Sequence, residues 1–266
     1  MRKITIIVLA FFCISICTSQ ENYKQSLDGV KRVKIYTQTN VKITVGSSND
    51  IIIGDYKDCK DCRKNDRIIN DKNKSKKLRP IYANGNDNTG YGLQVKREGD
   101  LLEILDLKSA YQRNPGLRII LPQGISISLN CGQLDGHAVI EGFSSEIDVE
   151  THVGRIDLID VSGPITANSL AGEVNIIFNA VNQKGPTTIR TSGSNIDVTL
   201  PKNTNANIEL RSDQGAVFTD FNFKPIKKDG LRAIGANRRI KSSINKGGVS
   251  IKISSHLGNI YLRKKE

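Results

Sequence analysis

Glycine or serine recurs every nine residues along the middle of this chain, and that spacing restricts the possible fold more than any other feature. The positions are Gly136, Ser145, Gly154, Gly163 and Gly172. Self-similarity at a fixed short period indicates a stacked architecture, in which each unit covers its neighbour. After a four-residue insertion the spacing restarts at Gly185 and continues at Ser194. We therefore expect a stack of short, similar units.

Each unit also carries two apolar residues, two and four positions after its glycine or serine. These pairs are Ala138 and Ile140, Ile147 and Val149, Ile156 and Leu158, Ile165 and Ala167, Val174 and Ile176, and later Ile196 and Val198. A period of two predicts a β-strand with one apolar face. Burying one such side chain contributes about 1.5 to 3 kcal/mol, so a single unit gains less than the ordering of its residues costs. The predicted fold is all-β, a β-solenoid or β-roll of stacked short strands with a nine-residue half-coil repeat.

The outward-facing residues indicate that two units make one full coil. Stacking every nine residues would place Asp148 beside Asp157, whereas stacking every eighteen places Asp148 beside Thr166 and Arg155 beside Glu173. Like charges on neighbouring strands destabilise a sheet and opposite charges stabilise it slightly. We therefore predict two facing sheets with one strand of each coil in each. A chain that turns every nine residues needs a positive φ or a close backbone approach at each corner, which accounts for the glycines.

Strands are also expected on both sides of the regular repeat. The segments "RVKIYT", "VKITVG", "IIIG", "LQVKRE", "LLEILDL" and "LRIILP" precede it, a weak copy at Thr204, Ala206 and Ile208 follows it, and "GVSIKI" and "GNIYLRKK" repeat the pattern near the end. From Asp55 to Gly92 the pattern disappears, and that stretch has ten basic and six acidic residues. Such a composition buries too little apolar surface to offset the entropy of ordering. We expect a charged, partly disordered loop excursion over residues 55–92.

The first residues have the pattern of a secretory signal peptide. Arg2 and Lys3 precede an apolar run from Ile4 to Ile16, followed by polar residues. The run is shorter than the roughly 20 residues of a membrane span, and no second candidate follows. Cleavage after Ser19 would leave residues 20–266 as a single domain without a transmembrane span. A lipid anchor on Cys17 is the alternative, disfavoured because that signal needs a small residue where Ile16 stands. We predict an exported protein of the periplasm, the outer membrane surface or the extracellular space.

Positive charge is concentrated near the end of the chain. Residues 124–200 contain nine acidic and three basic residues, a net charge of −6, whereas residues 221–266 contain two acidic and twelve basic residues, a net charge of +10. The basic segment 221–247 either caps the protein's own acidic strands or contacts a polyanion such as an acidic glycan or lipopolysaccharide. The candidate contacts are Lys224, Lys227, Lys228, Arg232, Arg238, Arg239, Lys241 and Lys246. Nucleic acid is excluded as a partner by the predicted compartment.

Three cysteines follow the signal peptide, and Cys59 and Cys62 form a C-x-x-C motif. A thioredoxin-like site needs that motif at the start of a helix, and zinc usually needs four ligands. In an oxidising compartment a disulfide between Cys59 and Cys62 is favoured over a free thiol and over a metal or redox site, with the role of Cys131 left open. The three histidines are too scattered to predict a metal cluster. His152 is expected to be packed or capping, because it shares a turn column with Phe143, Val161 and Leu170.

Two other groups of polar residues have a structural and a chemical interpretation. Asn84, Asn86, Asp87 and Asn88 could form a calcium loop, but a single carboxylate is too little charge and a turn is favoured. Glu146, Asp148, Glu150, Asp157 and Asp160 form an acidic patch that could belong to a carbohydrate-active β-helix enzyme. Such enzymes need a cleft and usually aromatic platforms, and this chain has no Trp. Solvated strand faces are favoured, and no catalytic residue, cofactor or metal is predicted.

The "LP", "SG" and "GNIYLRKK" order, together with "IDVTLPKNTNANIELRSDQGAVFTDFNF", resembles a secreted bacterial family. It is the Bacteroidetes-type β-strand-repeat adhesin-domain family of unknown function, related to the "head GIN" domain of autotransporter adhesins. The resemblance covers roughly residues 30–265, with departures at Ser145, Ser194 and residues 215–217. It implies a surface or envelope β-solenoid without catalytic residues. We therefore expect an exported, non-enzymatic, adhesin-like protein that binds or scaffolds an envelope or surface partner; the alternative is a lyase or glycosidase.

Overall fold

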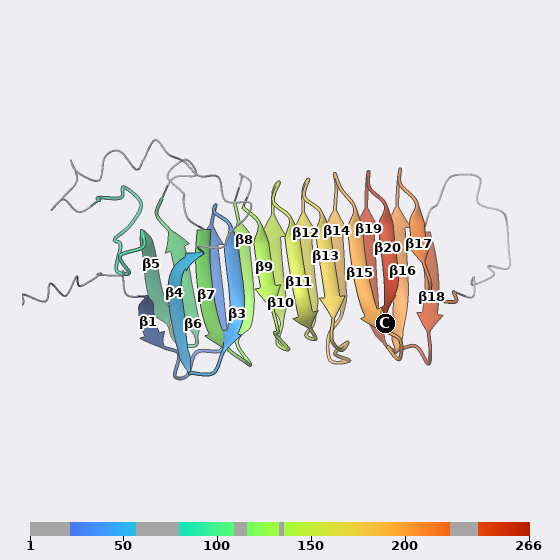
Figure 1. Ribbon diagram of the computed structural model, residues 1–266, viewed down its shortest axis with the longest axis horizontal. Coiled ribbons are helices and arrows are strands. Elements are labelled where there is room, and N and C mark those ends of the chain that lie inside the picture. Colours follow the sequence, from blue (N-terminus) through green and yellow to red (C-terminus); the bar gives the residue numbers. More distant parts are fainter. Residues whose placement is uncertain (1–21, 57–79, 109–115, 133–135, 224–238) are drawn as a thin grey trace, which may run out of the picture.

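The computed structural model describes residues 22–56, 80–108, 116–132, 136–223 and 239–266 (Figure 1). This part of the chain contains twenty strands and no helix. The strands form two ten-stranded sheets that mix parallel and antiparallel pairs. The protein is therefore all-β, as the alternation of apolar and polar residues predicts.

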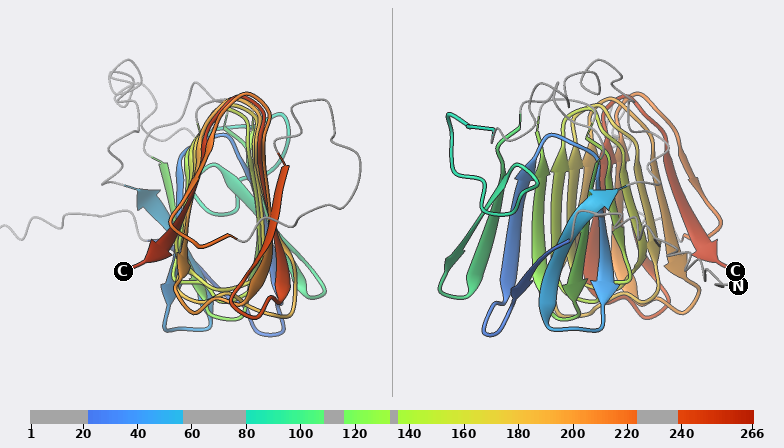
Figure 2. Two further views of the ribbon diagram at one scale, coloured as in Figure 1. Left: turned by 90° about the vertical axis from the view of Figure 1, so that its right-hand side faces the viewer. Right: turned by 60° about the vertical axis from the view of Figure 1, so that its left-hand side comes forward.

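We name the two sheets A and B and give their strands in spatial order. Sheet A contains β1 (Tyr23–Ser26), β4 (Asp50–Tyr56), β7 (Gly116–Pro122), β3 (Val41–Gly46), β9 (Ala138–Glu141), β11 (Ile156–Val161), β13 (Val174–Phe178), β15 (Ile196–Pro201), β20 (Ile260–Lys265) and β17 (Val217–Thr219). Sheet B contains β18 (Arg239–Ile244), β16 (Ala206–Ser212), β19 (Val249–Ser255), β14 (Thr187–Thr191), β12 (Ile165–Ser169), β10 (Ile147–Thr151), β8 (Ser126–Cys131), β2 (Arg32–Thr37), β6 (Leu101–Asp106) and β5 (Leu93–Glu98). Seen end-on, the sheets face each other across a flattened interior (Figure 2).

Through the middle of the molecule the chain alternates between the sheets, so that β8, β10, β12 and β14 lie in sheet B while β9, β11, β13 and β15 lie in sheet A. Strand β10 pairs in parallel with β12, and Asp148 lies opposite Thr166. In sheet A, Ile156 of β11 lies opposite Val174 of β13. Both pairs are eighteen residues apart, so the predicted eighteen-residue register is confirmed for these strands.

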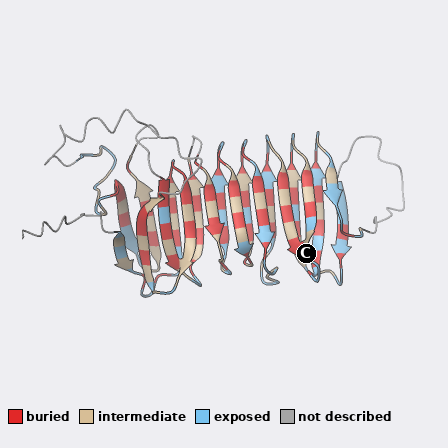
Figure 3. Ribbon diagram, in the orientation of Figure 1, coloured by how far each residue is buried: buried red, intermediate tan, exposed pale blue. Residues whose placement is uncertain are grey.

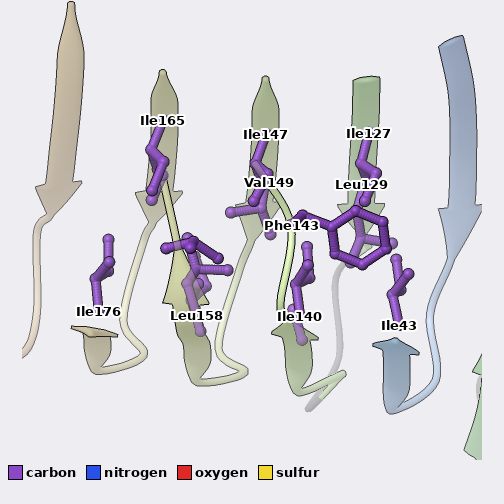
Figure 4. Close-up of a cluster of buried hydrophobic side chains, with 14 of the residues drawn as sticks. Ile43, Ile127, Leu129, Ile140, Phe143, Ile147, Val149, Leu158, Ile165 and Ile176 are labelled. Atoms are coloured by element: carbon purple, nitrogen blue, oxygen red, sulfur yellow. The ribbon is translucent and has the colours of Figure 1, made fainter. Parts of the chain in front are cut away.

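The core lies between the sheets and follows the predicted apolar positions. Burial alternates along each strand (Figure 3), because successive side chains of a strand point to opposite faces. Figure 4 shows Ile147 and Val149 from sheet B together with Ile140 and Leu158 from sheet A, and all four are fully buried. One continuous apolar cluster extends from Leu27 to Leu262.

One corner of the stack is lined by buried hydroxyl groups. The Thr151 Oγ1 hydroxyl donates to the Gly154 carbonyl oxygen at 2.7 Å, and the backbone N–H of Gly172 donates to Ser169 Oγ at 2.8 Å. These bonds satisfy polar groups at a corner where the chain turns and water is excluded. Cys131 occupies the same column, opposite Thr151, and is buried.

The two ends of the stack depart from sequential order. At one end, β2 and β3 lie between β6 and β7 on the outer side and β8 and β9 on the inner side. At the other end, β19 and β20 lie between β14 and β15 on the inner side and β16 and β17 on the outer side. The last two strands of the chain, β19 and β20, are thus inserted inside the stack, whereas the first strand, β1, forms one edge of sheet A. The local pattern predicts these strands but not their order.

Candidate functional site

Several of the predicted site residues lie outside the described residues. These are the signal peptide 1–19 with Cys17, the cysteines Cys59 and Cys62, and the basic residues Lys224, Lys227, Lys228, Arg232 and Arg238. The charged excursion is described only at its ends, since β4 continues to Tyr56 and the chain resumes at residue 80. Of the predicted polyanion contacts, Arg239 and Lys241 lie on β18, and Lys246 lies in the exposed turn that follows.

Strand β18 forms the outer edge of sheet B, where it pairs in an antiparallel arrangement with β16. The basic residues of β18 therefore lie beside further cations on β16, β19 and β14. We call this surface the basic face, and it consists of Arg190, Arg211, Arg239, Lys241, Lys252 and His256. A shallow pocket of about 370 Å³ lies within it. All six side chains are exposed.

Asp213 and Glu209 are the two acidic residues of this surface. Asp213 lies 2.8 Å from Arg211 Nε and 3.0 Å from His256 Nδ1. Hydrogen bonding to His256 and then to Arg211 lowers the pKa of Asp213, so its carboxylate stays ionised. Asp213 is therefore shared between the side chains of Arg211 and His256.

Glu209 is shared in the same way. Its carboxylate lies 3.2 Å from Arg239 Nε and 3.4 Å from Lys241 Nζ. Two of the predicted polyanion contacts thus pair with an acid of the protein itself, although Glu209 lies outside the acidic region 124–200 that the capping interpretation invoked. Both basic side chains nevertheless remain exposed.

Arg190 and Lys252 supply cations that sequence reasoning missed. Arg190 lies opposite Ser254, and Lys252 lies opposite Thr188, on the adjacent strands β14 and β19. Neither side chain has a hydrogen bond or ion pair to the part of the chain that the structure describes. Arg190 was not predicted because it lies in the net acidic region 124–200 of the sequence. The pairing of β14 with β19 places it beside the basic residues of the C-terminal strands. The basic face has five Lys and Arg residues against two acids.

The predicted acidic patch is divided between the two sheets. Asp148 and Glu150 lie on β10 in sheet B, whereas Asp157 and Asp160 lie on β11 in sheet A. A step of nine residues moves the chain to the opposite sheet, so acids that are close in sequence face opposite directions. Asp157 pairs with Arg155 at 2.7 Å. The prediction of one patch was wrong for these residues.

The expectation for His152 is also wrong, because its side chain is exposed. Phe143 and Val161 are buried, while Leu170 is 55% exposed. The supposed single column consists of two columns at opposite corners, again because nine residues are half a coil. His137 has the capping role instead, since its Nδ1 accepts a hydrogen bond from the Arg155 backbone N–H at 2.8 Å.

The candidate calcium loop is a turn held by Asp87. Its Oδ1 accepts hydrogen bonds from the Thr89 and Gly90 backbone N–H groups, and its Oδ2 accepts one from Gly92, each at 2.9 Å. Asn88 bonds both its amide oxygen and its amide nitrogen to Val95. No group of three or more His, Cys, Asp or Glu side chains among the described residues is arranged to hold a metal ion.

A second concave surface lies at the opposite end of the molecule, on the outer side of sheet A. It is a groove of about 760 Å³. Its lining residues, which we call the groove residues, are Asn22, Lys42, Thr44, Ile52, Gly54, Asp55, Tyr56, Tyr91, Arg118, Ile120 and Glu141. Sequence reasoning missed this site, because its residues come from separate strands and from both ends of the predicted excursion 55–92.

The described part of the molecule thus consists of two facing ten-stranded sheets and carries two candidate sites, the basic face and the groove. No protein-family model and no curated protein matches the chain. Among solved structures, it is similar to a "putative cell adhesion protein" from Clostridium sporogenes ATCC 15579, with 12% identity, coverage of 92% of this chain and 100% of that chain, and a TM-score of 0.39. We transfer no residue or function from that protein. The described part of the chain contains no helix with the length and apolarity that a membrane crossing needs.

Proposed function

We propose that this protein is an exported, adhesin-like β-solenoid that binds an anionic polymer of the cell envelope or surface. The solenoid description is supported by the eighteen-residue register and by the continuous core, which also favours a single domain over residues 20–266. Export is supported by the apolar run after Arg2 and Lys3. N-terminal sequencing of the exported protein should give Gln20 if the signal peptide is cleaved as predicted.

The observation that carries the proposal is the basic face. Exposed ion pairs contribute only about 0 to 1 kcal/mol each, so stabilisation of the fold is a weak reason for so many cations. A surface with several like charges, by contrast, attracts and concentrates an extended polyanion. Arg190 and Lys252 form no ion pair among the described residues, and Glu209, which lies opposite Lys252, pairs with Arg239 and Lys241 instead.

The test is binding of the mature protein to dextran sulfate, with neutral dextran as the matched polymer. The double variant Arg190→Gln, Lys252→Gln should bind at least tenfold more weakly than the parent. The control Lys34→Gln, Lys96→Gln removes the same charge at the other end of sheet B, where both residues flank Glu103. It should change the affinity less than twofold. An equal loss in both variants would show that net charge alone attracts the polymer, and absence of binding by the parent would contradict the proposal.

Cleavage of a glycan is the second candidate function, and the groove is the observation that favours it. Two carboxylates, Asp55 and Glu141, lie in it with Lys42 and Arg118, and paired carboxylates or a carboxylate with a nearby base are what glycan cleavage uses. The Lys42–Glu141 ion pair at 2.8 Å engages one of those carboxylates. Incubating the protein with acidic and neutral polysaccharides should release new reducing ends if the chain is an enzyme, and Asp55→Asn should abolish that release.

A further inference from the structure

The groove has features of a binding site that do not depend on the basic face. It lies over β3, β4, β7 and β9, at the opposite end of the molecule and on the other sheet. Its volume of about 760 Å³ is within the range of about 300 to 1,000 Å³ that is typical of small-ligand sites.

The floor of the groove is apolar. Ile52 of β4 lies opposite Ile120 of β7, and both belong to the row of residues on the outer side of sheet A. Both are only partly exposed. Two branched aliphatic side chains next to each other form a surface on which the C–H face of a small ring can pack.

The charged residues of the groove leave one cation without a partner. Lys42 and Arg118 are opposite each other on β3 and β7. Lys42 Nζ lies 2.8 Å from Glu141 Oε1, so these two charges compensate. Arg118 is exposed, and its side chain makes no hydrogen bond or ion pair within the described residues. A guanidinium group matches a carboxylate with two parallel hydrogen bonds.

The remaining walls carry groups that bond to hydroxyls. Asp55 and Asn22 supply acceptor oxygens, and Thr44 and Tyr56 supply hydroxyl groups. Burial raises the pKa of Tyr91, and the nearby Asp55 carboxylate raises it further, so the Tyr91 hydroxyl keeps its proton. The groove therefore combines an apolar floor, several hydroxyl-binding groups and one cation, Arg118, that has no ion pair among the described residues.

We infer that this groove binds a carboxylated sugar, such as a uronic acid residue of a glycan, with Arg118 holding the carboxylate. Asp55 and Asn22 then bond to ring hydroxyls, and the ring lies on Ile52 and Ile120. A neutral sugar would leave Arg118 without a partner, and a sulfated or phosphorylated chain without free hydroxyls would leave Asp55 facing negative charge. The inference goes beyond the proposed polyanion binding and concerns recognition alone, so it holds whether or not the sugar is cleaved.

The experiment measures binding of galacturonate and glucuronate trisaccharides to the mature protein by calorimetry, with the carboxyl-reduced trisaccharides as matched neutral probes. Reduction of the sugar carboxyl groups to alcohols should weaken binding at least tenfold. Arg118→Gln should weaken binding of the acidic trisaccharides at least tenfold, so that their affinity equals that of the carboxyl-reduced trisaccharides. Arg118→Lys should restore part of the lost affinity. Asp55→Asn should weaken acidic and reduced trisaccharides alike.

The variant Arg190→Gln separates this site from the basic face and should leave trisaccharide binding unchanged. Circular dichroism establishes that each variant keeps its β structure, and Arg118 is an exposed residue whose loss leaves the core intact. The inference is overturned if neither acidic trisaccharide binds, if the Arg118→Gln variant binds as the parent does, or if Arg190→Gln abolishes binding. If the parent protein binds dextran sulfate but neither acidic trisaccharide, the inference is overturned and the proposed function stands.

Discussion

The carbonyl oxygen of Gly136 occupies the space in which a β-carbon on Gly154 would stand. The same relationship joins Gly163 to the Ser145 carbonyl and Gly172 to the Gly154 carbonyl. None of these three glycines has a positive φ. The repeated glycines are therefore explained by close approach of one coil to the next, which was one of the two reasons that the spacing suggested.

Substituting Gly154 by alanine should destabilise the protein, because the new methyl group overlaps the backbone of the neighbouring coil. Forced overpacking of this kind costs about 1 to 3 kcal/mol. The loss should appear in the free energy of unfolding from urea titration. Ser145→Ala is the matched control at the same repeat position, since it adds no atom and removes only a hydrogen bond to the Ile125 carbonyl. Equal stability of Gly154→Ala and the parent would contradict the close-approach explanation.

Ile156→Asp should unfold part of the stack. Ile156 is fully buried on β11, and a charge there has no partner, so we expect a loss of more than about 4 kcal/mol. Ile177→Asp on the neighbouring strand β13 is the control, because Ile177 faces outward and is 39% exposed. It should cost about 1 kcal/mol at most. Similar melting temperatures for the two variants would show that the inward register is misassigned.

Removal of residues 259–266 should be far more damaging than a usual C-terminal truncation. Strand β20 lies between β15 and β17, and its Ile260 and Leu262 are fully buried. Burying two such side chains contributes about 3 to 6 kcal/mol, and the truncation also leaves β17 without its partner. Removing only residues 265–266 loses the exposed Lys265–Asp160 pair and should have little effect. A stable protein after the longer truncation, judged by thermal melting, would mean that β20 is not an internal strand.

Asp87 should make the stability depend on pH. Its burial would raise the pKa, but the hydrogen bonds from Thr89, Gly92 and Gly90 outweigh burial and lower it. Because the folded pKa is depressed, Asp87 stabilises the fold above its unfolded pKa of about 4 and loses that effect as pH falls through the folded pKa. Asp87→Asn should therefore lower the melting temperature at pH 7, and its difference from the parent should shrink in acid.

The control for this comparison is Asp100→Asn, which removes an acid whose side chain forms, within the described residues, only a long ion pair of 3.7 Å with Arg32. Its melting temperature should stay close to that of the parent at pH 7. A difference between Asp87→Asn and the parent that stays constant down to pH 2 would show that the Asp87 charge does not stabilise the turn.

The inward residues and the pairing of Asp148 with Thr166 could be predicted from sequence because both follow directly from a fixed period. The insertion of β19 and β20 inside the stack could not be predicted from sequence. The strands of the stack carry similar apolar pairs, so each of these two strands could pack equally well beside several others. The order is defined by long-range register, with Ile260 opposite Ile196 for β20 and Ile251 opposite Thr187 for β19. The sequence pattern carries no signal for that choice.

The sites were predictable to different degrees. Charge along the chain pointed to Arg239 and Lys241 but not to Arg190, which strand pairing brings to the same surface. The groove was missed entirely, because Arg118 lies in a segment that predicts an ordinary strand face, and Asp55 was assigned to the charged excursion 55–92. A concave surface depends on how the edge strand β1 and its neighbour β4 join the sheet, and these pairings are antiparallel and outside the repeat.

The most direct test of the account is the salt dependence of binding by the mature protein to purified lipopolysaccharide and, separately, to an acidic glycan. Attraction by the basic face should weaken steeply as salt rises from about 0.1 M to 1 M, where the Debye length falls from about 10 Å to 3 Å. The variant Arg190→Gln, Lys252→Gln should bind more weakly at low salt and show a shallower salt dependence. An affinity that is unchanged across this range, or a variant that follows the parent at every salt concentration, would contradict binding of an anionic polymer at the basic face.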